Sequence, residues 1–226
     1  MIEDENHKSN VDNIALRVIK SKLPQQINET ILVNNSGKNI FIEYSASLIV
    51  DYNKVDDGVV IVFRDISERK ERLDEIRYLS YHDYMTGFYN RRYFEQYIKT
   101  LDEKDCPVGM MLLDVDDLKK FNDTFGHDAG DQLITNVSRI IEAVAGESTI
   151  CRIGGDEFII IYDKEGDLLE IETRIKEELK TVSLFGRGVS VSIGFNSRLD
   201  KYDKLTDVQK RADQYLYACK KKYHSI

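Results

Sequence analysis

The 226-residue sequence has no long hydrophobic segment, no closely spaced cysteine pair and no excess of positive charge. Its apolar runs, such as residues 59–63, are far shorter than the roughly 20 residues that a membrane-spanning helix needs. The acidic, polar first residues are unlike a secretory signal peptide, which is basic and then apolar. A formal net charge of −8 argues against non-specific nucleic-acid binding, because that requires a basic surface. The sequence therefore predicts a protein that binds neither a membrane nor a nucleic acid.

The cysteines and the missing catalytic motifs narrow the protein class further. Cys106, Cys151 and Cys219 stand far apart, which argues against a disulfide framework or a cysteine metal cluster. We therefore expect reduced thiols in a cytoplasmic protein. No Ser-His-Asp pattern and no P-loop is present in the sequence. The length suits one large domain or two small ones.

Residues 151–161 form the most informative stretch. Two apolar runs flank Gly154 and Gly155, and the carboxylates Asp156 and Glu157 follow at once. A Gly-Gly pair between strand-like runs predicts a hairpin, because a tight primed turn needs positive φ and glycine adopts it without steric cost. The absence of side chains at the turn would leave room for a large ligand against the backbone. Taken alone, the stretch is equally compatible with a surface hairpin whose acids are solvated.

The first 81 residues predict a small α+β segment followed by a charged helix. Apolar spacing predicts a helix over residues 11–21, and turn signals separate strands at 30–33, 39–49 and 58–64. Residues 67–81 predict a helix with an imperfect heptad pattern, supported by a Glu68–Arg72 pair one turn apart. Such a helix would pair with its copy in a dimer or remain a solvated linker, and the pattern leaves both alternatives open.

From residue 82 onwards, strands alternate with helices. We expect strands at 108–113, 149–153, 158–162 and 188–195, and helices at 90–101, 118–145 with a break near Gly126, 165–182 and 205–223. The central hairpin interrupts a strict βαβ repeat. The predicted fold class is therefore an α/β (α+β) sandwich, in which helices flank a central mixed, mostly antiparallel sheet.

The ends of two predicted strands carry acidic residues that would bind metal. Asp114 follows the apolar strand at 108–113, and Asp156 and Glu157 leave the hairpin. If these strands pair, the three carboxylates converge. Magnesium takes a few hard oxygen ligands and completes its shell with water and phosphates, so this set suits a magnesium–nucleotide complex. Metals at such a site activate an attacking hydroxyl and stabilise charge during phosphoryl transfer.

Four motifs resemble one family in order along the chain: residues 82–94, 114–131, 154–158 and 211–224 resemble the diguanylate cyclase (GGDEF) domain. Met85 and Leu118 are mild departures from its usual leucine and phenylalanine. Tyr223, His224 and Ser225 replace the usual Gly-Arg-Asn, which removes one arginine that faces phosphate.

Residues 10–70 resemble the C-terminal half of a PAS sensor domain, with an unrelated α+β appendage as the alternative. The domains expected are a partial PAS-like segment at 1–66, a linker helix at 67–81 and a GGDEF domain at 82–226.

The resemblance implies a role for individual residues. By this likeness Mg²⁺, or alternatively Mn²⁺, is bound by Asp114, the Val115 carbonyl, Asp156 and Glu157. Asn122 and Asp131 would read the guanine edge. The N–H groups of Asp117 and Leu118, and the side chains of Lys119 and Lys220, would hold phosphates. Asp156, Glu157 and Lys119 would form the catalytic set.

The resemblance also implies an activity. A diguanylate cyclase condenses two GTP molecules into cyclic di-GMP with release of pyrophosphate, as a homodimer. Many members carry an Arg-x-x-Asp motif for product inhibition, but this chain has Ala145 and Ser148 there, so we expect no such site. One alternative is a degenerate, non-catalytic GGDEF domain that binds GTP as a regulatory module. Another is a nucleotide-free scaffold that works through its N-terminal segment.

Overall fold

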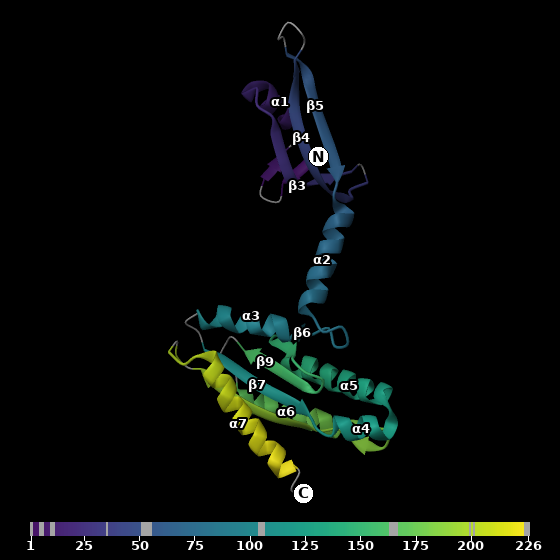
Figure 1. Cartoon of the computed structure of the whole chain (residues 1–226), viewed down its shortest axis with the longest axis vertical. Helices are drawn as coiled ribbons and strands as arrows, with labels where there is room; N and C mark the ends of the chain where they lie inside the picture. The colour runs from purple at the N-terminus through teal and green to yellow at the C-terminus, as the bar shows by residue number, and fades with distance from the viewer. Residues whose placement is uncertain are drawn as a thin grey trace. The chain divides into compact units, whose positions relative to one another are not determined.

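The computed structural model describes residues 2–4, 7–9, 12–34, 36–50, 56–103, 107–162, 167–198, 200 and 202–223. The chain divides into two compact units, Met1–Arg77 and Tyr78–Ile226 (Figure 1). Each unit has its own hydrophobic core. Across the described ranges, no helix combines the length and the apolar character that crossing a bilayer requires.

The first unit is an antiparallel sheet with one helix against it. Its strands are β1 (Ile2–Asp4), β2 (His7–Ser9), β3 (Gln25–Val33), β4 (Asn39–Val50) and β5 (Asp56–Asp65), in the order β2-β1-β3-β4-β5. Ile14 and Val18 lie one turn apart on α1 (Asp12–Ser21) and are buried in one cluster with Ile42 and Tyr44 of β4. The predicted helix and three strands are confirmed. The short strands β1 and β2 were not predicted.

Helix α2 (Ser67–Tyr81) has the bounds that the sequence predicts. None of its residues is buried, and Arg72 pairs with Glu68 as expected. Three of its apolar side chains are exposed: Leu73 (47%), Ile76 (62%) and Leu79 (61%). The boundary between the two units falls within this helix.

The second unit is built on a five-stranded sheet in the order β12-β7-β9-β8-β6. Its strands are β6 (Tyr89–Asn90), β7 (Val108–Val115), β8 (Thr149–Arg152), β9 (Glu157–Tyr162) and β12 (Val191–Arg198). Only the β6–β8 pair is parallel among these described strands, so the predicted mixed, mostly antiparallel sheet is confirmed. Two strands that the sequence did not predict, β10 (Ser183–Leu184) and β11 (Arg187–Gly188), form a separate small hairpin.

Helices cover both faces of this sheet (Figure 1). Helices α3 (Arg91–Asp102) and α7 (Leu205–Tyr223) pack on one face, and α4 (Leu118–Phe125), α5 (His127–Ala145) and α6 (Leu168–Lys180) pack on the other. All of β7 is buried, because Met110 and Leu112 face the first layer while Met111 and Leu113 face the second. The predicted break between α4 and α5 falls at Gly126, whose φ of +88° is costly for other residues.

A close approach of α7 to β12 and a set of bonds around Asp102 fix the position of α7. A Cβ atom at Gly194 would lie 2.2 Å from the Ala212 carbonyl oxygen, so glycine allows α7 to approach β12 closely. The fully buried Arg198 donates to the Leu101 carbonyl at 2.9 Å and pairs with Asp102. Asp102 also accepts a hydrogen bond from the first residue of α7, Leu205, at 2.9 Å. These bonds join α3, β12 and α7, and α7 carries Lys220.

Candidate active site

The pairing of β7 with β9 brings the predicted acidic residues together. Asp114 lies opposite Glu157 in the strand register. The Val115 N–H donates to the Asp156 carbonyl at 2.9 Å, so the ladder continues into the turn. The strand pairing on which the predicted convergence depends is therefore confirmed. Asp114 is buried, Asp156 is half-buried and Glu157 is exposed.

The reason expected for the Gly-Gly pair is wrong. The hairpin forms, but neither Gly154 nor Gly155 adopts the left-handed φ that a primed turn would need. A Cβ atom at Gly154 would instead lie 2.6 Å from Oε2 of Glu157, whereas a Cβ atom at Gly155 would meet nothing within 4 Å. The first glycine makes room for the Glu157 side chain, and the second leaves open space beside Asp156.

Asp114 lies in an environment that favours a bound cation. Burial raises the pKa of its carboxyl group, and the neighbouring charges of Asp156 and Asp116 raise this pKa further. The Lys220 ammonium opposes both effects, because its Nζ lies 2.6 Å from Oδ2 of Asp114. The sequence analysis predicts that Lys220 binds phosphate, but it does not predict this ion pair with Asp114.

The donor set fits magnesium as a partial shell. No group of three or more His, Cys, Asp or Glu side chains within the described ranges could enclose a metal ion by itself. Asp114 and Asp156 interact electrostatically, and a lysine ammonium already lies at Asp114. Two hard carboxylates beside open space match the way Mg²⁺ is bound by one or two protein ligands together with phosphates.

The start of α4 has the features expected of a phosphate site. Asp117 is the N-cap residue with φ +59°, and its side chain makes no capping hydrogen bond. The first N–H groups of a helix carry partial positive charge and bind anions. The Lys119 side chain is exposed, whereas Lys120 pairs with Asp117 at 2.7 Å.

Asn122 carries a buried polar atom that fits a ligand. Its Oδ1 has no hydrogen-bond partner in the described structure. It lies against Gly130 at the start of α5, where a Cβ atom would come within 1.8 Å of Oδ1. Asp131, the next residue of α5, is exposed. A buried amide oxygen without a partner is costly, and a bound base with an N–H donor would satisfy it.

A family model described as the GGDEF domain of diguanylate cyclases matches residues 80–225. The chain belongs to this family. The uncharacterized protein Rv1354c of Mycobacterium tuberculosis is 36% identical over 171 residues, which cover 72% of this chain but 27% of that protein. The response regulator PleD of Caulobacter vibrioides is 34% identical over 165 residues, which cover 67% of this chain and 36% of PleD. The chain thus spans about a third or less of the length of these curated relatives.

A solved structure supports the fold of the GGDEF domain. The coiled coil and GGDEF domain of DgcB from Caulobacter crescentus, in complex with c-di-GMP, has a TM-score of 0.64 and 29% sequence identity. The match covers 69% of this chain and 88% of that one. The family match begins at residue 80, so the PAS-like interpretation of residues 10–70 and the division at 66 and 81 stay predictions.

The first motif of the GGDEF domain stabilises the central hairpin through Asp83 and Arg152. Arg152 pairs with Asp83 at 3.0 Å and donates to the Gly155 carbonyl at 2.7 Å. Burial alone would raise the pKa of Asp83, but hydrogen bonds from Thr86 and Arg152 outweigh it and lower that pKa. The two residues lie within stretches 82–94 and 151–161 of the sequence, but no sequence pattern indicates their contact, because it is long-range.

Arg91 holds the same hairpin from the start of α3. Its Nε donates to the Ile153 carbonyl at 2.9 Å, and its guanidinium lies 3.9 Å from Oε2 of Glu157. On the other side of β7, Asp116 accepts hydrogen bonds from the hydroxyl groups of Ser190 and Ser192. As with Asp83 and Arg152, no sequence pattern indicates that Arg91, Asp116, Ser190 and Ser192 belong near the site. Only side-chain contacts in the fold connect them to it.

The structure describes only some of the C-terminal residues that belong to the predicted phosphate site. Lys220 lies in the last turns of α7, and Tyr223 ends the helix without a described side chain. His224 and Ser225, which replace the family's Arg-Asn, lie outside the described residues.

Proposed function

We propose that this chain is a magnesium-dependent diguanylate cyclase, a nucleotidyltransferase that converts two GTP molecules into cyclic di-GMP and two pyrophosphates. The observation that carries this proposal is the buried Asp114 beside Asp156 and a lysine ammonium, at the paired ends of β7 and β9. Membership of the GGDEF family supports the reaction class. Cys151 and Cys219 are free thiols, which fits the cytoplasmic location that we include in the proposal.

The chain's own residues would bind and orient the nucleotide. Asn122 and Asp131 would hold the guanine edge, while the start of α4 and the side chains of Lys119 and Lys220 would bind phosphates. Asp114, Asp156 and the Val115 carbonyl would hold the metal, with Glu157 assisting. Bound Mg²⁺, or Mn²⁺, supplies charge neutralisation at the phosphates and helps ionise the attacking hydroxyl.

Catalysis would take place in a homodimer, with one GTP bound to each protomer. Each 3′-hydroxyl would attack the α-phosphate held by the other protomer, and pyrophosphate would leave. The exposed apolar side chains of Leu73, Ile76 and Leu79 on α2 support pairing of this helix with its copy. Sedimentation of the full chain with and without a non-hydrolysable GTP analogue tests this part of the proposal.

The second candidate is a GGDEF domain that binds GTP without catalysis and acts as a regulatory module. The observation that favours it is the replacement of the phosphate-facing arginine by His224. Retention of the carboxylates Asp114, Asp156 and Glu157 favours the enzyme. The two candidates differ in product formation and agree on GTP binding, so both quantities must be measured.

The deciding experiment is incubation of the full chain with GTP and Mg²⁺, followed by chromatography for cyclic di-GMP. We expect product from the unchanged chain and a loss of at least about 100-fold in Asp156→Ala, because charge stabilisation at the phosphates is worth several kcal/mol. Glu177→Gln on α6 is the control, since its exposed carboxylate lies outside the site. Tight GTP binding without product would favour the regulatory module. Normal turnover in Asp156→Ala would contradict the metal assignment.

We also infer guanine selectivity from Asn122 and Asp131. A site that hydrogen-bonds a base can reject an analogue that leaves buried polar groups unpaired, by a factor of up to about 10⁴. Product analysis with ATP and GTP mixed measures this selectivity. A substantial yield of adenine-containing dinucleotide would contradict these two assignments.

We further propose that product inhibition through an Arg-x-x-Asp site is absent. Ala145 is buried at the end of α5, and the Ser148 N–H donates to its carbonyl at 2.8 Å. Neither side chain offers the charged contact that an arginine fork makes with phosphate. Progress curves with added cyclic di-GMP test this. Strong noncompetitive inhibition that substitutions at residues 145–148 abolish would contradict it.

A further inference from the structure

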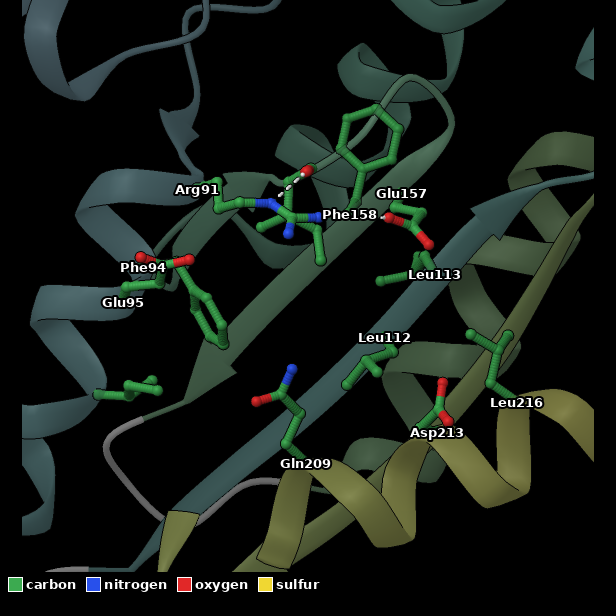
Figure 2. A pocket seen from close by; sticks show the side chains of 12 residues that line it. Arg91, Phe94, Glu95, Leu112, Leu113, Glu157, Phe158, Gln209, Asp213 and Leu216 are labelled. Atoms are coloured by element: carbon green, nitrogen blue, oxygen red, sulfur yellow. Dashed lines mark hydrogen bonds and ion pairs between the residues drawn. The ribbon is translucent and has the colours of Figure 1, made fainter. Parts of the chain in front are cut away.

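A cavity of about 330 Å³ lies on the α3–α7 face of the sheet (Figure 2). Asp114, Asn122 and the first residues of α4 are not among its lining residues. Figure 2 shows Arg91 and Glu95 on the α3 side, Gln209 and Asp213 on the α7 side, and Leu112 of β7 between them. The volume is at the lower end of the range of about 300–1,000 Å³ for small-molecule sites.

The cavity combines an apolar lining with a polar rim. Its apolar residues on this face come from both helices and from the sheet: Phe94, Ile98, Leu112, Ile153 and Leu216. Leu113 and Phe158 also border the cavity, although they belong to the core cluster on the other face of the sheet. Phe94, Leu112 and Leu216 belong to one buried cluster, so the cavity opens directly onto the core of this face. An occupant with an apolar body would therefore remove hydrocarbon surface from water, which is favourable in proportion to the area covered.

The rim carries more negative than positive charge. Its charged residues are the three acids Glu95, Glu157 and Asp213 and the single base Arg91. Arg91 is already engaged, since it donates to the Ile153 carbonyl and lies 3.9 Å from Glu157. No residue in the described ranges forms a salt bridge with Glu95 or Asp213. The rim would therefore repel a phosphate or carboxylate ligand and attract a cation.

We propose that this cavity binds a small organic cation, with a planar apolar body and an amidinium, guanidinium or ammonium group. The cationic group would bind Asp213 or Glu95, because charge-assisted bonds to carboxylates are strong and an amidinium matches a carboxylate with two parallel N–H donors. The apolar body would cover Leu112 and its neighbours. Among the residues assigned to the GTP site, only Glu157 also lies on the rim of this cavity, and the residues assigned to guanine and phosphate are not part of its lining.

A ligand bound in the cavity would affect the central hairpin. Glu157 lines the cavity and begins β9, and Arg91 at its edge holds Ile153 before the turn. A cation that attracts Glu157 would change the surroundings of the neighbouring Asp156. An effect on GTP turnover is expected for this reason, and only this consequence depends on the proposed function.

The test is calorimetric titration of the full chain, without nucleotide or metal, with three probes of similar shape. These are benzamidine (cationic), benzamide (neutral) and benzoate (anionic). We expect saturable binding of one benzamidine per chain, with both other probes at least about tenfold weaker because they lack the charge-assisted pair. Equal binding of benzoate, or no saturable binding of benzamidine, would overturn the proposal. Neither outcome depends on diguanylate cyclase activity.

Substitutions locate the binding. Asp213→Asn and Glu95→Gln keep the shape of the rim, and at least one should weaken benzamidine binding by about fivefold or more. Ile98→Phe should fill part of the cavity and weaken binding further. The control is Glu177→Gln, which makes the same charge change on α6, on the opposite face of the sheet. An equal loss in this control, or no loss in the two rim variants, would show non-specific attraction and overturn the proposal.

Discussion

Lys220→Met should increase the affinity of the chain for a divalent cation in the absence of nucleotide. The lysine Nζ lies 2.6 Å from Oδ2 of Asp114, the carboxylate expected to bind the metal. A metal and the lysine would therefore compete for the same carboxylate group. GTP phosphates would draw the lysine away, so the metal and the nucleotide would favour each other's binding. Removing the lysine should remove the competition and also weaken GTP binding.

The size of this effect follows from the burial of the pair. A hydrogen bond between charged groups contributes about 1.5–3 kcal/mol. The Lys220 side chain is 36% exposed and the Asp114 side chain 11%, so solvent screening reduces the contribution to about 1–2 kcal/mol. This equals roughly a 5- to 30-fold gain in metal affinity.

The assay is titration with Mn²⁺, with the free ion measured by electron paramagnetic resonance. It is performed at about pH 8, because burial raises the pKa of Asp114 and a protonated carboxyl would not bind metal. Lys221→Met is the matched control, since its ammonium lies over the Tyr217 ring and the charge change is the same. Unchanged Mn²⁺ affinity in Lys220→Met, or an equal gain in Lys221→Met, would refute the reasoning.

Three further predictions concern stability and nucleotide binding. The lowered pKa of Asp83 means that its ionised form stabilises the fold above about pH 4, and that this contribution is lost as the pH falls through the folded-state pKa. Asp83→Asn should reduce the fall in unfolding free energy at acidic pH, as measured by urea unfolding at several pH values. A pH dependence equal to that of the unchanged chain would contradict this prediction. Arg198→Ala should cost about 2–4 kcal/mol in the same assay, because it empties a fully buried site and removes the bonds to Leu101 and Asp102; a cost below about 1 kcal/mol would contradict this. Gly130→Ala should displace Asn122 and weaken binding of fluorescent GTP while the fold is kept, and unchanged affinity would argue against the guanine assignment.

The element order was predictable because local patterns carry it. Residues 108–113 form a continuous apolar run, and both faces of the observed β7 are buried. Two glycines between apolar runs predicted a hairpin, and β8 pairs with β9 there. Short elements such as β6 and the β10–β11 hairpin were not predicted, because two residues carry no periodicity.

The conformation of the Gly-Gly turn was not predictable from composition. Glycine is used where φ must be positive and where a side chain would not fit, and the sequence signal is the same in both cases. At Gly154 the second reason applies, since Oε2 of Glu157 occupies the space that a Cβ atom would need. Distinguishing the two reasons requires the position of a side chain three residues further on.

The contacts that hold the acidic residues in place are long-range, and this explains why sequence patterns missed them. Asp83 and Arg152 are 69 residues apart, and as isolated residues both look like solvated surface charges. In the fold the arginine side chain is 9% exposed and bonds to the turn that carries Asp156. Arg91 bonds to the same hairpin at Ile153. The position of Asp156 therefore depends on Asp83 and Arg91. Both lie in the first family motif, residues 82–94, which contributes to the site by holding the β8–β9 hairpin in place.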